Sequence, residues 1–209
     1  MESLGFIEWC LDNLNYWTIM LLMAIESSFI PFPSEVVIPP AAYMAASTGE
    51  MNVWLVILFA TVGAVIGAFV NYGLALWLGK PIVYKFANSR LGHMCLIDQK
   101  KVETAEQFFV KYGVVATLVG RLVPAVRQLI SIPAGLAKMN IVKFAIYTAI
   151  GAGAWNSVLA ALGYYFASVV PEEQLVATVT KYSHEIGYAI IGVVAVGLLI
   201  VIYKGIKKS

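Results

Sequence analysis

Three stretches of the sequence contain no charged residue, and they limit most narrowly what this chain can fold into. They cover residues 53–79, 144–170 and 186–203, with lengths of 27, 27 and 18 residues. A helix of about 20 apolar residues crosses the hydrocarbon core of a bilayer. Only 12% of the whole chain is charged, whereas soluble domains carry roughly 25%. The sequence therefore predicts an all-α integral membrane protein with about three transmembrane helices.

The charge in the segments between these stretches predicts an orientation. Residues 80–112 carry six lysine and arginine residues, residues 204–208 carry three lysines, and residues 171–185 carry three glutamates. Loops on the cytoplasmic side of a membrane are enriched in lysine and arginine. We therefore expect the 80–112 segment and the C-terminus to lie in the cytoplasm.

The chain is predicted to form one membrane domain over residues 1–209. Residues 1–14 place apolar side chains on one helical face and acidic ones on another, as an interfacial helix does. Residues 80–112 are expected to form a cytoplasmic loop that includes an amphipathic helix. Residues 63–67 contain a GxxxG pattern, which lets another backbone approach closely.

Two further apolar segments, 15–47 and 113–137, are each interrupted by proline beside charge. The first contains ESSFIPFPSEVVIPPAA and the second contains GRLVPAVRQLISIPAGLA. Proline removes a backbone N–H and clashes with the preceding turn, so it breaks a helix. The prolines expected to break these segments are Pro31, Pro33, Pro124 and Pro133. Each segment is predicted to be a re-entrant hairpin of two half-helices, and the two enter from opposite sides as an inverted repeat.

Four charged residues lie at these breaks, and their chemistry indicates a binding site. Broken helix at membrane depth is tolerated only inside protein or beside a watery cavity, and charge there is functional by default. The planar donors of arginine suit phosphate, so we expect Arg121 and Arg127 to bind a phosphate group. Ser34 is a candidate N-cap, and the helix start that follows it adds N–H groups for the same phosphate. Burial raises the pKa of a carboxyl group and a nearby arginine lowers it, so Glu26 and Glu35 are predicted to carry or gate protons.

A structural alternative exists for the same four charges. They can form buried salt bridges, such as Glu26–Arg127 and Glu35–Arg121 or another pairing, that pin the two hairpins together. Buried ion pairs are weak evidence for stability, but they can fix register.

Two pairs of residues place polar groups inside the charge-free stretches. These are Asn71–Tyr72 and Trp155–Asn156. Hydrogen bonds between helices explain both pairs. Trp155 and Asn156 are also candidates for lining the cavity that the four charges require.

At these residues the chain resembles the DedA membrane proteins, which are related to the VTT-domain lipid scramblases of eukaryotes. The resemblance is carried by ESSFIPFPSE (26–35), by GRLVPAVRQLISIPAG (120–135) and by the glycine-rich stretch that ends in ALWLGKP. It implies two opposed re-entrant hairpins and lipid translocation coupled to the proton gradient. Family functional positions match at Glu26, Glu35, Arg121 and Arg127. Some members are thought to return undecaprenyl phosphate, and others are linked to phosphatidylethanolamine.

The resemblance and the charges together predict a proton-coupled flippase of a bacterial inner membrane. Its expected cargo is undecaprenyl phosphate, which would be recycled for cell-wall biogenesis. The alternatives are a flippase or scramblase for a phospholipid such as phosphatidylethanolamine, and a structural protein of membrane homeostasis. A phosphatase would need a nucleophile with a base or a metal, and the motifs carry no His, Cys or Asp cluster. We therefore expect no enzyme, cofactor, metal or nucleic acid, and a homo-oligomer is compatible with the sequence.

Overall fold

The computed structural model describes residues 9–28, 33–89, 99–123, 126–171, 174–183, 185, 186, 189 and 192. All regular structure in these residues is helical, which confirms the predicted all-α fold. The elements are α2 (Tyr16–Glu26), the 3₁₀ turn η1 (Ser34–Val36), α3 (Ile38–Ser47), α4 (Val53–Ala87), α6 (Gln99–Leu122), α7 (Ser131–Leu136) and α8 (Ile141–Phe166). Nearly all of the predicted span 186–203, and residues 1–8 of the predicted interfacial helix, lie outside the described residues.

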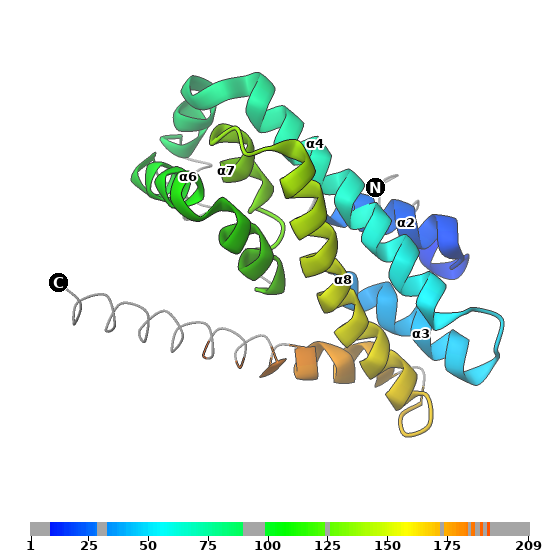
Figure 1. Ribbon diagram of the computed structural model, residues 1–209. Helices are drawn as coiled ribbons and strands as arrows, with labels where there is room; N and C mark the ends of the chain where they lie inside the picture. Colours follow the sequence, from blue (N-terminus) through cyan, green and yellow to red (C-terminus); the bar gives the residue numbers. More distant parts are fainter. Residues whose placement is uncertain are drawn as a thin grey trace.

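The two longest apolar helices, α4 and α8, form an antiparallel pair through the centre of the molecule (Figure 1). Phe144 near the start of α8 stacks on Tyr72 of α4, whereas Asn156 further along α8 meets Thr61 nearer the start of α4. Within them, Val53–Ile82 and Ile141–Phe166 are long and apolar enough to cross a membrane.

The ends of these helices differ from the boundaries expected from charge alone. Helix α8 begins at Ile141 because the side chain of Asn140 accepts hydrogen bonds from the N–H groups of Val142 and Lys143. Helix α4 continues beyond the predicted span to Ala87, but Gly79 has a φ of 68° and interrupts its helical geometry. The 80–112 segment is therefore largely helical where it is described, with its second part at the start of α6.

The first broken segment folds back on itself at one end of the α4–α8 pair. Helix α2 opens with a capping box, in which Asn15 and Thr18 satisfy each other's backbone N–H groups. The hydroxyl of Tyr16 accepts a hydrogen bond from the N–H of Asn52 at 2.8 Å. Helix α3 ends at Ser47, only a few residues before Asn52. Both ends of this helix–break–helix unit therefore lie near the start of α4.

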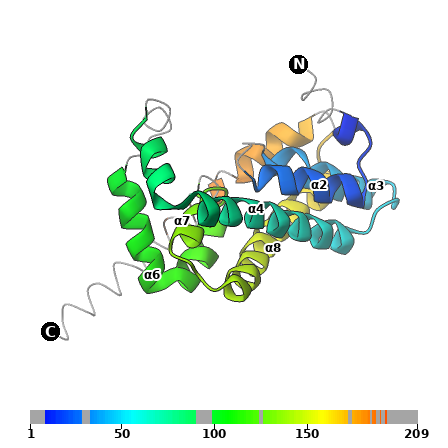
Figure 2. The same cartoon turned by 90° about the horizontal axis from the view of Figure 1, so that it is seen from above.

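The second broken segment also folds back on itself, at the other end of the α4–α8 pair (Figures 1 and 2). Helix α6 has a non-helical residue, Tyr112, and its second part runs toward the centre of the molecule. The hydroxyl of Thr117 hydrogen-bonds the sulfur of Met139, and the hydroxyl of Tyr72 donates to the carbonyl of Met139 at 2.6 Å. Since Met139 directly precedes α8, both ends of this unit lie near the start of α8.

The two units pack on the central pair in matching ways. Helix α2 packs on α4 and α6 packs on α8, while α3 crosses to α8 and α7 crosses to α4. At Gly67 of α4 an added Cβ would overlap the carbonyl of Ala24 in α2, and at Gly151 of α8 it would crowd the carbonyl of Leu118 in α6. Gly63 approaches α2 in the same way as Gly67, which confirms the close packing predicted from the GxxxG pattern. Each unit thus packs its first helix on one long helix and its second helix on the other.

Apolar side chains form two buried clusters, one beside each unit. The first is built around α2, α3 and the second half of α8, and the second around α6, α7 and the start of α8. The outer surface of α4 is also apolar, with Trp54 at 75% and Trp77 at 82% exposure. These tryptophans are separated by about 35 Å along an ideal helix, close to the thickness of a bilayer core. Tryptophan is enriched at both membrane interfaces, so this surface is suited to lipid.

Candidate functional site

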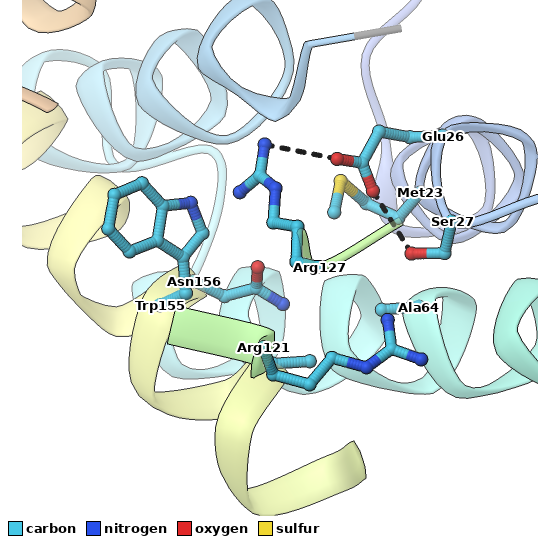
Figure 3. A pocket seen from close by; sticks show the side chains of 9 residues that line it. Met23, Glu26, Ser27, Ala64, Arg121, Arg127, Trp155 and Asn156 are labelled. Atoms are coloured by element: carbon cyan, nitrogen blue, oxygen red, sulfur yellow. Dashed lines mark hydrogen bonds and ion pairs between the residues drawn. The ribbon is translucent and has the colours of Figure 1, made fainter. Parts of the chain in front are cut away.

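The two helix breaks meet near the middle of the α4–α8 pair, where they surround a cavity of about 10 Å³ (Figure 3). A cavity of this size has room for about one water molecule. Its lining includes Glu26 from the first break, and Arg121 and Arg127 from the second. Ala64 of α4 and Ala152 of α8 close it from the long helices. The side chains predicted to form a site from residues far apart in sequence therefore do come together.

Arg127 joins the two broken segments. Its Nη2 atom lies 3.1 Å from Oε1 of Glu26 and 3.5 Å from Oε2 of Glu35. All three side chains are buried. The guanidinium carbon also lies 5.3 Å from the ring centroid of Trp155, a cation–π distance. One arginine of the second segment thus neutralises carboxylates on both sides of the first break.

Arg121 is held differently, although it lines the same cavity. It is 2% exposed, and its Nη2 atom donates a hydrogen bond to the hydroxyl of Ser131 at 2.9 Å. The pairing Glu35–Arg121, one of the salt bridges considered above, does not form, because Glu35 contacts Arg127 instead. The Nε atoms of Arg121 and Arg127 have no hydrogen-bond partner within the described ranges. The site therefore retains donors that an anion could use.

Serines stand beside both carboxylates. The hydroxyl of Ser27 donates to Oε2 of Glu26 at 3.0 Å, and that of Ser34 donates to Oε2 of Glu35 at 3.4 Å. The predicted N-cap role of Ser34 is wrong, since Pro33 occupies the N-cap position and no side chain caps the turn. The reason is that η1 intervenes before α3, so the Ser34 hydroxyl turns to the neighbouring carboxylate. Ser34 is nevertheless fully buried at the break.

The prolines occupy two kinds of position. Pro33 is extended (φ −78°, ψ 127°) between the end of α2 and η1, within the first break. Pro133 instead lies inside the first turn of α7, where proline is tolerated because an N–H there lacks an intrahelical partner. Pro31 and Pro124 lie outside the described residues.

Asn71 of α4 links the two breaks, a role that was not predicted. Its side-chain nitrogen donates to the carbonyl of Ser27 at 3.2 Å and to the carbonyl of Gln128 at 3.3 Å. Ser27 caps the end of α2, and Gln128 lies in the turn before α7. Only hydrogen bonding between helices was expected of Asn71. A strongly polar amide inside a charge-free span was the available signal.

Trp155 and Asn156 of α8 both line the cavity. The indole of Trp155 faces Arg127 (Figure 3), and its Nε1 atom has no hydrogen-bond partner in the part of the chain that is described. The amide of Asn156 hydrogen-bonds the hydroxyl of Thr61 in α4 over 3.2 Å. Asn156 therefore both lines the site and ties the long helices together.

The chemistry of the site follows from its charges and its burial. Two guanidinium groups and two carboxylates give a formal sum of zero in a region that is almost closed to water. In such surroundings charge interactions are stronger than in water. An anion that contacts the arginines therefore competes with Glu26 and Glu35 for Arg127, while Arg121 is held by a neutral hydroxyl.

Comparisons with known proteins identify the family of this chain. The VTT domain family matches residues 30–165. The chain is 31% identical over 195 residues to the "Alkaline phosphatase-like protein" of Lactococcus lactis strain MG1363, covering 93% of this chain and 89% of that one. It is 30% identical over 194 residues to "Undecaprenyl phosphate transporter A" of Bacillus subtilis, covering 93% and 91%. "Protein DedA" of Escherichia coli is 27% identical over 158 residues, covering 74% and 69%.

No solved structure matches this chain. The family match begins within the first break and covers the second break and nearly all of both long helices, and the relatives align over most of their length. Together with the two apolar helices, these matches establish that the chain is a membrane protein of the VTT domain family, to which the DedA proteins belong.

Proposed function

We propose that this protein moves a lipid with a phosphate headgroup across the membrane, with the lipid tail remaining in the bilayer. The observation that carries the proposal is the meeting of two oppositely charged helix breaks at the middle of the α4–α8 pair. Binding sites of secondary transporters are built from broken helices at the midplane. A buried guanidinium with unpaired N–H groups suits a phosphate oxygen.

In this proposal each half of the site has its own task. Arg121 and Arg127 hold the phosphate, with Ser34 and Ser131 available as hydroxyl donors. Glu26 and Glu35 carry or gate protons, because an arginine drawn toward the phosphate leaves a carboxylate that a proton can neutralise. The present arrangement, with Arg127 on both carboxylates, then corresponds to the site between transport events.

The proposed topology places both broken units as re-entrant hairpins that enter from opposite faces. Their ends lie at opposite ends of the α4–α8 pair, and their packing on that pair follows a twofold pattern. The lysines of the 80–112 segment support a cytoplasmic position for the end of α4. The C-terminus is proposed to lie on the same side.

Undecaprenyl phosphate of a bacterial inner membrane is the proposed cargo. Relatives in Bacillus subtilis and Staphylococcus aureus bear the name "Undecaprenyl phosphate transporter A", each 30% identical to this chain. A phospholipid such as phosphatidylethanolamine is the alternative cargo. We further propose that the protein is not an enzyme, although some relatives carry a phosphatase-like name. The described residues hold no group of three or more His, Cys, Asp or Glu side chains that could bind a metal ion.

The test is transport by the purified protein in liposomes. A fluorescent undecaprenyl phosphate analogue is placed in both leaflets, and its exposure to an external quencher is followed with and without an imposed pH gradient. Parallel samples contain labelled phosphatidylethanolamine or labelled undecaprenol, which lacks the phosphate. Faster movement of undecaprenyl phosphate alone supports the proposal and its cargo, and faster movement of phosphatidylethanolamine would identify the alternative cargo. Release of inorganic phosphate would identify an enzyme instead. Equal movement of all three lipids, or no movement above protein-free liposomes, would contradict it.

The proton-coupling part needs its own variants. Glu26→Gln and Glu35→Gln keep the shape of each side chain but remove its titratable charge. Each is expected to abolish the acceleration by a pH gradient while the purified protein remains folded. An unchanged response to the gradient in both variants would exclude the proton role and leave the phosphate role standing.

A further inference from the structure

A second hollow lies away from the central site, where α6 is interrupted and α8 begins. Its volume is about 470 Å³. It is lined by Lys111, Tyr112 and neighbouring apolar residues of α6, and by Met139, Asn140 and Lys143 around the start of α8. None of these side chains was assigned a binding role by the sequence patterns or by the proposed transport site. The hollow therefore requires its own explanation.

The hollow exists because α6 is interrupted there and α8 begins there. Tyr112 has φ −130° and ψ 22°, so the first part of α6 separates from the part that runs inward. The next residue, Gly113, has no side chain to fill the gap, and the sulfur of Met139 lies in van der Waals range of where its Cβ would be. Asn140 uses its side chain to cap α8. The space is thus built into the backbone of both helices.

Two cations, Lys111 and Lys143, face this space. Lys111 and Lys143 both line it and both are exposed. The ammonium group of Lys111 lies 5.1 Å from the ring centroid of Tyr112. Within the described residues neither lysine is in a salt bridge, and Glu103 of α6 accepts a hydrogen bond from Gln99. The hollow therefore has the charge that complements an anion.

The walls beside the lysines are apolar and accessible. Val110 is 73% exposed and Val115 is 55% exposed, and both line the hollow. Ile141 and Val142, which open α8 next to Lys143, are 53% and 60% exposed. Lysine above exposed aliphatic residues is the usual arrangement at a membrane interface. A ligand that fits both parts has an anionic head and an apolar tail.

We propose that this hollow is a binding site for the phosphate headgroup of a lipid at the membrane surface. The identity of the lipid rests on the proposed function, since a phosphate lipid that passes Arg121 must also enter or leave at a surface. Arg121 follows Tyr112 by nine positions in α6, which corresponds to about 14 Å of helix. That distance is about half of a bilayer core. Helix α6 thus connects the proposed surface binding site to the central arginines.

The test measures lipid binding apart from transport. Purified protein is titrated with dioleoyl phosphatidic acid, and with dioleoylglycerol as the same lipid without phosphate, and the bound fraction is read by native mass spectrometry. The double variant Lys111→Ala/Lys143→Ala is compared with Lys85→Ala/Lys100→Ala, which removes two other exposed lysines. A surface lysine contributes about 1 kcal/mol to binding of an anionic lipid, so the first variant is expected to bind phosphatidic acid about 30-fold more weakly.

The control variants decide between this site and its alternatives. Lys111→Arg/Lys143→Arg keeps both charges and is expected to retain binding, whereas Lys85→Ala/Lys100→Ala is expected to lose less than about threefold. Equal losses in both alanine pairs would show only general attraction to charge and would overturn the site. Full competition by inorganic phosphate would also overturn it, because the ligand would then be the free ion.

The outcome is separable from that of the proposed function. Arg121→Gln lies outside the hollow and is expected to keep surface binding of phosphatidic acid while losing transport. If the lysine pair has no effect on binding or on the lipid concentration needed for half-maximal transport, the surface site fails and the transport proposal stands. If wild-type protein binds through the lysines but transports no phosphate lipid, the surface site stands and the transport proposal fails.

Discussion

The two broken segments have nearly the same architecture and opposite chemistry. Each consists of a helix that runs to the centre, a break, and a short helix that crosses to the other long helix. The first break carries Glu26 and Glu35, each beside a serine hydroxyl. The second carries Arg121 and Arg127, whose Nε atoms lack partners in the described structure. Neither break alone contains both the carboxylates and the arginines. The proposed function therefore depends on contact between the two breaks.

The two arginines of the second segment differ as much as the two segments do. Arg127 contacts both carboxylates, whereas Arg121 contacts a serine of its own segment. Arg127 therefore belongs to the connection between the segments, and Arg121 does not.

Replacing Arg127 with alanine is expected to have the largest effect. The change leaves Glu26 and Glu35 buried without a cation, and breaking a buried ion pair from one side costs about 3–5 kcal/mol. Both the thermal unfolding temperature in detergent and liposome transport should fall sharply. Adding Glu26→Gln and Glu35→Gln to the same protein should recover stability but not transport. If the two glutamine substitutions do not recover stability, the loss caused by Arg127→Ala does not come from unpaired carboxylates.

Arg121→Gln is expected to separate transport from stability. Glutamine can still donate to Ser131, and the change removes a buried charge that forms no direct salt bridge among the described residues. A charged hydrogen bond to the phosphate is worth about 1.5–3 kcal/mol, so transport should fall at least about tenfold. The unfolding temperature should stay close to that of the wild type. A large loss of stability would mean that Arg121 is a structural residue like Arg127.

Asn71→Ala is expected to affect both breaks at once. It leaves the carbonyls of Ser27 and Gln128 without their amide donor, and each buried unsatisfied group costs about 1–3 kcal/mol. Hydrogen exchange should therefore rise both at the end of α2 and in the turn before α7. Asn88→Ala, which removes an exposed amide bonded to Gln99, is the control and should change neither region. An increase at only one break would contradict the linking role.

Ser131→Ala is expected to have the smallest effect. It removes the hydroxyl that holds Arg121 but leaves every charge in place. A neutral hydrogen bond contributes about 0.5–1.5 kcal/mol, which corresponds to a change of about two- to tenfold. The change should appear in the lipid concentration needed for half-maximal transport. Ser27→Ala, the matching change beside Glu26, should instead alter the response to a pH gradient.

The sequence predicted the elements of this fold better than it predicted their contacts. The charge-free stretches that form most of α4 and α8 could be predicted, because the hydropathy of a segment depends only on its own residues and not on how the segment packs. The alternative salt bridge Glu35–Arg121 could not be judged from the chain, because the register between two segments that lie so far apart depends on how both pack against the long helices. Ser34 was misjudged as a cap for a related reason, since the 3₁₀ turn forms only in the packed break.

The hydrogen-bond partners of Asn71 could not be predicted from the sequence. An isolated amide in a span predicts a hydrogen bond but not its partners. Those partners are backbone carbonyls of two breaks, and any residue type supplies a carbonyl. The residue types in the sequence therefore do not indicate which carbonyls Asn71 binds.

The balance of charge in the central site has an electrical consequence. Two arginines and two glutamates cancel, so the protein's own side chains contribute no net charge there for the membrane voltage to act on. A phosphate headgroup that crosses alone would move at least one negative charge, at about 2.3 kcal/mol for each 100 mV. A proton taken up by Glu26 or Glu35 on the side that the lipid leaves, and released on the side that the lipid reaches, would cancel one unit of that charge. The transport rate of a monoanionic lipid should then be independent of voltage at constant pH, and so should the energy needed to move it.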